Sequence, residues 1–422
     1  MISAPRGDRA SARLLLLGVS VRALAASAVR SPHASRRFPD GFLALDYFGD
    51  ADLLSLASGH PIRVLCLSRD LDRPRSVETL ARSALDLEWQ ALVYSGGLEN
   101  RPDLLRRLEN RGAVLGNGPD VVEAVRDPTV FFPFLRRAGI PHPLTFAGGR
   151  DRAPVNGPPC LWKPIRSGGG IRVRLAQPCR PRPRGFYLQQ YLRGTPGSAS
   201  FVSASGRAVL LGVTEQLAGF RDLGASGFRY GGNIAGPPHR ILSRQALAVL
   251  AKAASAITRR FGLRGLMGLD FILSGGVPHI IEINPRYTAS MELFEDASDK
   301  GLLDVHLEAL ERGRLPSGPF PVRRFLAKGI LYATRAVRWA SSLTLAGLDV
   351  RDRPAEGEPI EIGHPICTLV VGGASPEECR RRLAEGAGLV RRTLRVATRN
   401  APRARRRQTF AASAGARRSV LR

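Results

Sequence analysis

Two carboxylates and an amide in the second half of the chain have the residue types and spacing of a metal site. Asp270 lies in the apolar run 268–273, while Glu282 and Asn284 lie in a second run, 279–286, after a glycine-containing turn. We expect the two runs to pair as a hairpin, with Asp270 beside the other two side chains. Carboxylate and amide oxygens are ligands that Mg²⁺ prefers when it also holds nucleotide phosphates. The sequence therefore predicts a magnesium site on this hairpin.

The alternation of side chains along the second strand predicts which of them reach that site. Glu282 and Asn284 would share one face, while Ile281 and Ile283 would point into the core. Arg286 lies just past the strand, where a guanidinium could contact a transferring phosphoryl group. An ordinary polar face is the alternative, but Asn-Pro-Arg directly after a buried strand favours the metal site.

A lysine and a glycine-rich turn form a second cluster. Lys163 belongs to the strand-like run 161–165 and is one of only four lysines among the 63 basic residues. A second strand-like run covers 171–174, and the turn between the runs holds Ser167, Gly168, Gly169 and Gly170. Glycines let main-chain N–H groups approach an anion, and a lysine on the preceding strand could reach the same phosphates. A polar turn without function is the alternative. The chain has no Gly-Lys pair, so the turn is not a P-loop.

Together these motifs resemble the ATP-grasp superfamily of carboxylate-amine ligases, over roughly residues 115–310. The resemblance implies an enzyme that uses ATP with Mg²⁺, or with Mn²⁺ as an alternative. Lys163 would bind the ATP phosphates, residues 167–170 would form a lid, and Arg286 would face the transferred phosphate. The implied metal ligands are Asp270, Glu282 and Asn284. The implied hinge segment, which reads the adenine, is Gln189, Gln190, Tyr191 and Leu192.

Two positions depart from the family pattern. Many members carry a glutamate where this chain has Gln189, and a second one, for the ribose, near the position of Pro196. Many also carry an early lysine before the first helix of the grasp domain, where this chain reads Arg126-Asp127-Pro128. The departures concern the nucleotide contacts and leave the predicted metal ligands intact.

The resemblance implies a ligase that converts a carboxylate to an acyl phosphate and joins it to an amine, a reaction that depends on position and electrostatics. A biotin-dependent type of carboxylase that uses bicarbonate is one alternative, and a basic nucleic-acid-binding protein is another. A looser resemblance, to predicted bacterial ligases for pterin- and furan-type one-carbon cofactors, suggests an amino-acid or cofactor-amide product. Arg229 could pair with a substrate carboxylate, and a helix that begins near 287–292 could hold an anion.

The residues before these motifs predict a small parallel α/β domain. Apolar runs at 14–17, 43–45, 62–67 and 91–94 have the pattern of buried strands, and Ser20 could cap a helix over 22–30. A cleaved leader is the alternative, since three arginines precede the first run, but Arg22 interrupts the apolar segment. The chain lacks a G-x-G-x-x-G fingerprint, so dinucleotide binding has little support.

The predicted fold class is α/β, with four successive parts. A Rossmann-like domain over 1–115 precedes a two-lobed ATP-grasp domain over 116–318, which begins with two short helices over 120–138. A β-rich segment over 319–399 would contain strands at 327–332 and 365–371 and a helix at 376–383, and would add a strand layer. We expect His364 and Cys367 to be packed residues. Residues 400–422 would form a basic disordered tail.

The charge and the cysteines limit the choice of partners. The formal net charge is +27 over 422 residues, but the last 43 residues alone hold 14 arginines against one acid, so the excess indicates a solvated tail more than a nucleic-acid surface. Five scattered cysteines without a Cys-x-x-Cys pair favour a reducing, cytoplasmic location. Apolar stretches fall short of a bilayer span. We therefore expect small-molecule carboxylate and amine substrates, no membrane or nucleic-acid partner, and leave a homodimer open.

Overall fold

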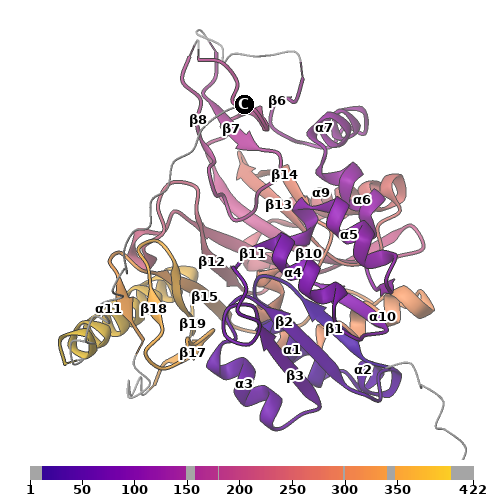
Figure 1. Ribbon diagram of the computed structural model, residues 1–422. Helices are drawn as coiled ribbons and strands as arrows, with labels where there is room; N and C mark the ends of the chain where they lie inside the picture. Colours follow the sequence, from indigo (N-terminus) through magenta and orange to yellow (C-terminus); the bar gives the residue numbers. More distant parts are fainter. Residues whose placement is uncertain (1–11, 149–156, 179, 298–299, 340–346, 401–422) are drawn as a thin grey trace, which may run out of the picture.

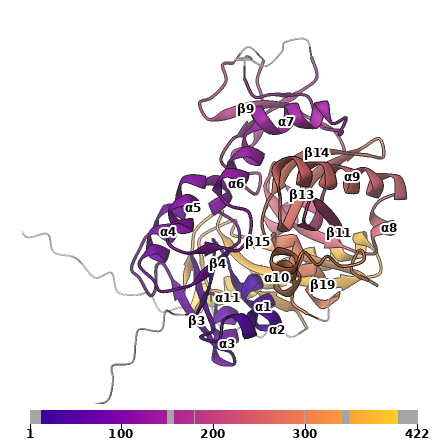
Figure 2. The same cartoon turned by 90° about the vertical axis from the view of Figure 1, so that its right-hand side faces the viewer.

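The computed structural model describes residues 12–148, 157–178, 180–297, 300–339 and 347–400. Three main sheets organise these residues (Figures 1 and 2). A parallel sheet forms the N-terminal part, a small antiparallel sheet lies at the top of both views, and a large antiparallel sheet runs beside them. The α/β class with an N-terminal parallel domain is confirmed.

The N-terminal sheet is parallel, in the order β3-β2-β1-β4-β5. Its strands and helices are β1 (Leu14–Leu17), α1 (Arg22–Val29), α2 (Pro32–Arg37), β2 (Phe42–Asp46), α3 (Ala51–Ser58), β3 (Ile62–Cys66), α4 (Val77–Leu85), β4 (Ala91–Tyr94), η1 (Leu98–Asn100), α5 (Pro102–Glu109) and β5 (Ala113–Val114). Leu14 and Leu16 pack in one apolar cluster with α1, while Leu15 and Leu17 pack in another with α4 and α5. The strand is therefore covered on both faces, which explains its continuous apolar run.

The first helix begins differently from our expectation. Ser20 does not cap α1, because Val21 is the N-cap residue and its side chain makes no capping bond. The main-chain oxygen of Ser20 instead accepts a hydrogen bond of 3.0 Å from the Ser95 hydroxyl. The turn after β1 is thus tied to the end of β4.

Two short helices, α6 (Pro119–Arg126) and α7 (Pro128–Arg137), follow this sheet, as predicted. Asp127 separates them, and its side chain accepts a 2.7 Å bond from the main-chain N–H of Thr129, which caps α7. Arg126 is the last residue of α6 and lies directly before this cap.

The small sheet has the order β6-β9-β7-β8. Its strands are β6 (Thr145–Phe146), β7 (Cys160–Pro164), β8 (Arg174–Leu175) and β9 (Phe186–Gln190). The predicted strand over 171–174 is wrong except at its last residue, because β8 begins at Arg174. Gly169, Gly170 and Arg172 have positive φ angles of 62°, 70° and 63°, which an extended strand cannot contain.

The large sheet is antiparallel, in the order β14-β13-β10-β11-β12-β15-β19-β17. Its first part comprises β10 (Thr195–Ala204), β11 (Arg207–Ala218), η2 (Arg221–Leu223), β12 (Tyr230–Ala235), α8 (Pro238–Ile241), α9 (Arg244–Phe261), β13 (Gly265–Ser274), β14 (Val277–Asn284), η3 (Ala289–Ala297) and α10 (Leu302–Arg312). Leu250, Ala253 and Ile257 lie on one face of α9 and pack against this sheet. The hairpin β13–β14 forms one edge of this sheet.

The C-terminal segment extends the same sheet. It contains β15 (Phe325–Tyr332), β16 (Val337–Arg338), β17 (Asp349–Arg351), β18 (Pro359–Ile360), β19 (Pro365–Gly373) and α11 (Pro376–Asn400). Both predicted strands are present, but the helix is longer than predicted and ends at Asn400. Cys367 is buried as expected, whereas His364 is exposed. The expected tail beyond Asn400 lies outside the described residues.

One buried carboxylate joins three parts of the chain. Glu292, in η3, accepts bonds of 2.7 Å from Arg22 of α1, 2.5 Å from Lys328 of β15 and 2.7 Å from Arg351 of β17. The N-terminal sheet, the large sheet and the C-terminal segment therefore meet at this side chain. Among the described residues, no helix has the length and apolar character to cross a membrane.

Candidate active site

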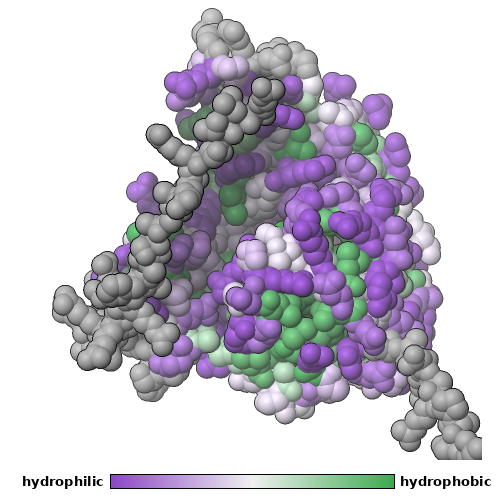
Figure 3. Space-filling view, viewed as in Figure 1, coloured by the Kyte–Doolittle hydropathy of each residue, from purple (hydrophilic) through white to green (hydrophobic). Residues whose placement is uncertain are grey.

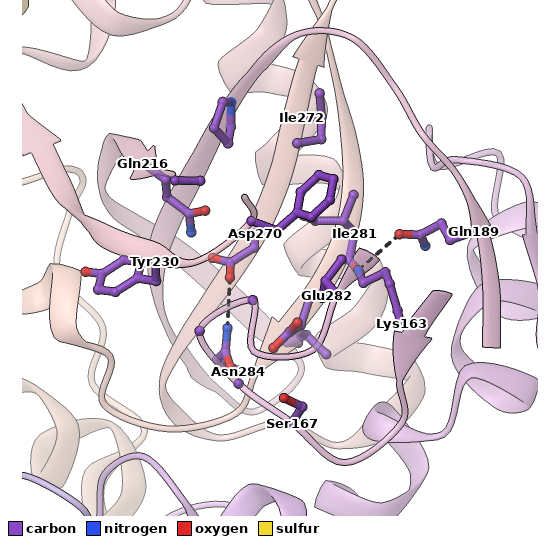
Figure 4. A pocket seen from close by; sticks show the side chains of 18 of the residues that line it. Lys163, Ser167, Gln189, Gln216, Tyr230, Asp270, Ile272, Ile281, Glu282 and Asn284 are labelled. Atoms are coloured by element: carbon purple, nitrogen blue, oxygen red, sulfur yellow. Dashed lines mark hydrogen bonds between the residues drawn. The ribbon is translucent and has the colours of Figure 1, made fainter. Parts of the chain in front are cut away.

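A pocket of about 460 Å³ lies between the small sheet and the large sheet. Figure 3 shows the surface hollowed beneath the small sheet, and Figure 4 shows the side chains that line the pocket. The residues predicted to bind the metal, the nucleotide and the transferred phosphate all line it: Lys163, Ser167, Gly168, Gly169, Gly170, Gln189, Gln190, Tyr191, Leu192, Asp270, Glu282, Asn284 and Arg286. The fold thus brings together residues that are up to 123 positions apart in the sequence.

The predicted metal ligands meet on the hairpin β13–β14. Asp270 is paired directly with Glu282 in the strand register, and the amide nitrogen of Asn284 donates a 3.2 Å bond to the Asp270 carboxylate. Burial, with the Glu282 charge as the next cause, raises the pKa of Asp270 to about 6. We call these three residues the Asp–Glu–Asn cluster.

The alternation along β14 differs from the prediction at one residue. The register shifts between Asp270 and Phe271, so that Phe271 is paired with Ile280 and Ile281 is the extra residue of a β-bulge. Ile280 and Ile283 are buried in the core, whereas Ile281 lines the pocket (Figure 4). The bulge keeps Glu282 and Asn284 on the pocket side.

The Asp–Glu–Asn cluster has the chemistry of a divalent-cation site. Its oxygen donors are hard, and the two carboxylates lie side by side on neighbouring strands, where a divalent cation could bind to both. No group of three or more His, Cys, Asp or Glu side chains in the described part of the chain could hold a metal. The donors of the Asp–Glu–Asn cluster are two carboxylates and an amide, a set that fits Mg²⁺ better than zinc, which prefers Cys and His.

Lys163 lies in the pocket wall at the end of β7. Its ammonium donates to the side-chain oxygen of Gln189 at 3.0 Å and to the main-chain oxygen of Ile281 at 3.4 Å. The amide nitrogen of Gln189 in turn donates to the Thr145 hydroxyl at 3.0 Å. Both partners of the ammonium are neutral oxygens, so its positive charge is available to an anion in the pocket.

The glycine-rich loop (167–170) lies against the segment 226–230. The main-chain N–H of Tyr230 donates to the carbonyl of Gly169 at 2.9 Å. At Gly170, a Cβ atom would lie only 1.8 Å from the carbonyl oxygen of Phe228. This contact requires glycine, both for the close approach and for the positive φ.

Arg286 is held by the N-terminal part of the chain. Its guanidinium pairs with Glu99 of η1 and donates to the Tyr287 carbonyl at 3.0 Å. Burial alone would raise the pKa of Glu99, but the charge of Arg286 lowers it below its ordinary value. Arg286 lines the pocket with its orientation fixed by a buried carboxylate.

Arg126 is a pocket residue that the sequence analysis missed. It donates to Glu282 at 2.5 Å, to the Ser167 carbonyl at 2.7 Å and to Asn100 at 3.0 Å. Burial would lower the pKa of Arg126, but Glu282 and then Glu99 raise it above the ordinary value. The sequence held a signal for this residue. Arg126 is the first residue of the segment Arg126-Asp127-Pro128, where many family members carry the early lysine.

The remaining wall of the pocket carries neutral hydrogen-bonding groups. They are Ser198, Gln216, Tyr230, Asn233, Thr288 and Ser290. Arg229 is not among them, because its guanidinium lies 3.8 Å from the centre of the Tyr332 ring and donates to the Gly363 carbonyl at 2.6 Å. The hypothesis that Arg229 pairs with a substrate is therefore not supported. The helix expected near 287–292 is η3, whose first residues reach this wall.

Comparison with known proteins identifies the family. Residues 126–290 match a family model described as an ATP-grasp domain. These residues form an ATP-grasp domain. The match begins at Arg126 and includes the glycine-rich loop, the hinge segment and the Asp–Glu–Asn cluster.

Similar proteins of this superfamily have several activities. A carbamoyl phosphate synthase large chain of Rubrobacter xylanophilus is 25% identical over 248 residues, which are 55% of this chain and only 23% of that protein. The biotin carboxylase domain of a Hydrogenobacter thermophilus 2-oxoglutarate carboxylase, solved as a dimer with MgADP and bicarbonate, has a TM-score of 0.63 at 15% identity and covers 88% of both chains. An L-amino acid ligase of Bacillus licheniformis has a TM-score of 0.61 at 13% identity, covering 89% of this chain and 97% of that one. The chain therefore shares its fold with enzymes of different activities.

Proposed function

We propose that this protein is an ADP-forming ligase that activates a carboxylate as an acyl phosphate and joins it to an amine. The observation that carries the proposal is the convergence in one pocket of Lys163, the glycine-rich loop and the Asp–Glu–Asn cluster. Two carboxylates opposite a lysine suit a nucleotide that is held through its phosphates and a divalent cation.

Each group has a role in this proposal. Lys163 and the N–H groups of the glycine-rich loop would bind the phosphates, and the hinge segment (189–192) would bind the adenine. Asp270, Glu282 and Asn284 would hold Mg²⁺ or Mn²⁺, which neutralises phosphate charge. Arg286, oriented by Glu99, would contact the transferred phosphoryl group and stabilise its developing negative charge.

The contact between the glycine-rich loop and segment 226–230 supports a role in excluding water. An acyl phosphate is lost if water reaches it before the amine does. A loop that closes over the nucleotide would protect it, and the 2.9 Å bond from Tyr230 to Gly169 would hold the closed position.

The substrates are proposed only as a class. The neutral hydrogen-bonding wall and Arg286 suit a polar carboxylate, and the product would be an amino-acid amide or a cofactor amide of the pterin or furan type. Free thiols at Cys66, Cys367 and Cys379 fit a reducing cytoplasm. A homodimer is proposed by analogy with the dimeric carboxylase domain.

A coupled assay of ADP release across pairs of carboxylates and amines tests this function. We expect release that requires both partners, and mass spectrometry should find the amide. Glu282→Gln, which removes one charge of the Asp–Glu–Asn cluster, should lower turnover by several orders of magnitude while circular dichroism stays unchanged. Normal turnover in this variant at saturating Mg²⁺ would contradict the proposed metal site.

A carboxylase that uses bicarbonate is the second candidate. It is favoured by the carboxylase fold, which covers 88% of both chains and so extends past the matched ATP-grasp domain. Bicarbonate would then support ADP release without any amine. Amine-dependent release with no effect of bicarbonate favours the ligase.

A further inference from the structure

Arg126 occupies a position where three parts of the chain meet. Its side chain is only 11% exposed and donates four hydrogen bonds. The partners are Glu282 of the Asp–Glu–Asn cluster, the main-chain oxygens of Ile283 and of Ser167 in the glycine-rich loop, and Asn100 of η1. One arginine thus connects the predicted metal site, the loop over the nucleotide pocket and the N-terminal part.

The bond to Glu282 conflicts with metal binding at the same carboxylate. The guanidinium lies 2.5 Å from Glu282 Oε1, so a divalent cation on this side chain would be a few ångströms from a buried like charge. Burial weakens the screening of that repulsion. The Arg126 guanidinium and a metal ion can share Glu282 only at a cost in free energy, and the one that binds Glu282 more strongly displaces the other.

We propose that Arg126 is a positioning residue that neutralises Glu282 until the metal arrives, and that its displacement by the metal frees the glycine-rich loop at Ser167 to move onto the nucleotide. The inference rests on the proposed metal site and adds a coupling between metal loading and the loop. The Nε–H group of Arg126 is buried without a hydrogen-bond partner, so the side chain is not saturated in its present position.

The coupling is reciprocal by thermodynamic linkage. If metal binding at Glu282 weakens the bond from Arg126 to Ser167, then that bond weakens metal binding by the same factor. Coupling energies of this kind correspond to about 5- to 150-fold in affinity. Removing Arg126 should therefore tighten metal binding in the absence of nucleotide, which is opposite to the effect of removing a ligand.

The test measures Mn²⁺ binding without nucleotide, by electron paramagnetic resonance of the free ion. We expect Arg126→Gln to bind Mn²⁺ at least about fivefold more tightly than the wild type. Glu282→Gln should bind it more weakly, and the double variant should match Glu282→Gln, because the competitor matters only when the carboxylate is present. Arg106→Gln is the matched control, since Arg106 makes an exposed pair with Asp120 at 2.7 Å outside the pocket.

Trypsin cleavage in the glycine-rich hairpin reports on the loop. Arg172 and Arg174 are exposed there. Arg126→Gln without metal should be cut several times faster at these sites than the wild type or Arg106→Gln. Arg126→Lys keeps the charge beside Glu282 but cannot make all of these bonds at once, so its Mn²⁺ affinity should lie between those of the wild type and Arg126→Gln, and it should be cut faster than the wild type.

The outcomes separate this inference from the proposed function. If Glu282→Gln leaves Mn²⁺ binding unchanged even with ADP present, the metal site is wrong and the inference fails with it. If Glu282→Gln weakens Mn²⁺ binding but Arg126→Gln does not tighten it, the metal site stands and only the proposed displacement of Arg126 by the metal is wrong. If Arg126→Gln does not fold, Arg126→Lys decides: wild-type cleavage in that variant would overturn the coupling to the loop.

Discussion

The ammonium of Lys163 and the side-chain oxygen of Gln189 lie 3.0 Å apart, on the neighbouring strands β7 and β9. The residue expected to bind the phosphates therefore contacts the first residue of the hinge segment. Gln189 is neutral and leaves the charge of Lys163 uncompensated, whereas a glutamate at this position would form an ion pair with it.

We predict that Lys163→Arg weakens ATP binding or turnover clearly, and that Lys163→Ala weakens it more. The site is only 8% exposed, and a guanidinium is larger than the ammonium and needs a planar set of acceptors. Calorimetric titration with ATP and the ADP-release rate measure the effect. Lys252→Arg, an exposed lysine on α9, is the matched control. Equal affinity and rate in Lys163→Arg would mean that the lysine has no special role.

The glycine-rich loop offers a pair of matched substitutions. A Cβ at Gly170 would clash with the Phe228 carbonyl at 1.8 Å, whereas a Cβ at Gly168 meets no atom within 4 Å. We predict that Gly170→Ala lowers ADP release at least about tenfold through strain and a displaced loop, while Gly168→Ala stays near wild type. Similar losses in both variants would show that the contact with Phe228 does not matter.

Much of the fold follows from local patterns. The strand Leu14–Leu17 was predictable because four adjacent leucines indicate burial on both faces. The hairpin β13–β14 was predictable because two apolar runs flank a glycine-containing turn. The bulge at Ile281 was not predictable, since it depends on the register with β13 rather than on the composition of β14. The early start predicted for β8 failed because Arg172 has a positive φ angle, which the apolar residues Ile171 and Val173 on either side of it do not reveal.

Long-range pairs account for the rest. Arg126 reaches Glu282 across 156 positions, and Glu292 reaches Lys328 across 36 and Arg351 across 59. No local spacing specifies these contacts, because the sheet order decides which strands are neighbours. Residue type and spacing were enough to bring the proposed metal ligands to one pocket, but they could not distinguish Arg229, which packs on Tyr332, from Arg126, which lines the pocket.

The junction at Glu292 gives a prediction about stability. Glu292→Gln leaves Arg22, Lys328 and Arg351 without their shared buried carboxylate, and breaking such a network costs about 3–5 kcal/mol. The midpoint of urea unfolding should fall accordingly. Glu358→Gln removes a more exposed partner of Arg75 between the same parts of the chain and should cost about 1 kcal/mol or less. A small change in Glu292→Gln would mean that the junction is not a main source of stability.

The buried carboxylate of Asp46 leads us to predict that this group makes the protein less stable as the pH rises. Its carboxylate is fully buried, one oxygen accepts main-chain bonds from Phe48 and Gly49, and the other has no partner. Burial, the largest cause, raises the pKa of Asp46 from 3.8 to about 7 despite those main-chain bonds. The folded state therefore holds the proton more strongly than the unfolded state does, so this group lowers the free energy of unfolding as the pH rises from about 4 to about 7.

We predict that Asp46→Asn is more stable than the wild type at pH 8, by at most about 4 kcal/mol, because the amide cannot ionise. The difference should shrink through pH 7 to 5 and be lost near pH 4, where Asp46 is protonated in both states. Asp70 should show the opposite pH dependence of stability, because its hydrogen bond with Arg69 lowers the pKa of Asp70. Asp70→Asn should therefore be less stable than the wild type at pH 8 and equally stable in acid. Asp50, whose pKa burial also raises, will leave part of the pH dependence in Asp46→Asn. Urea unfolding at several pH values measures all three proteins, and a stability gain in Asp46→Asn that did not change with pH would contradict a buried titrating carboxylate.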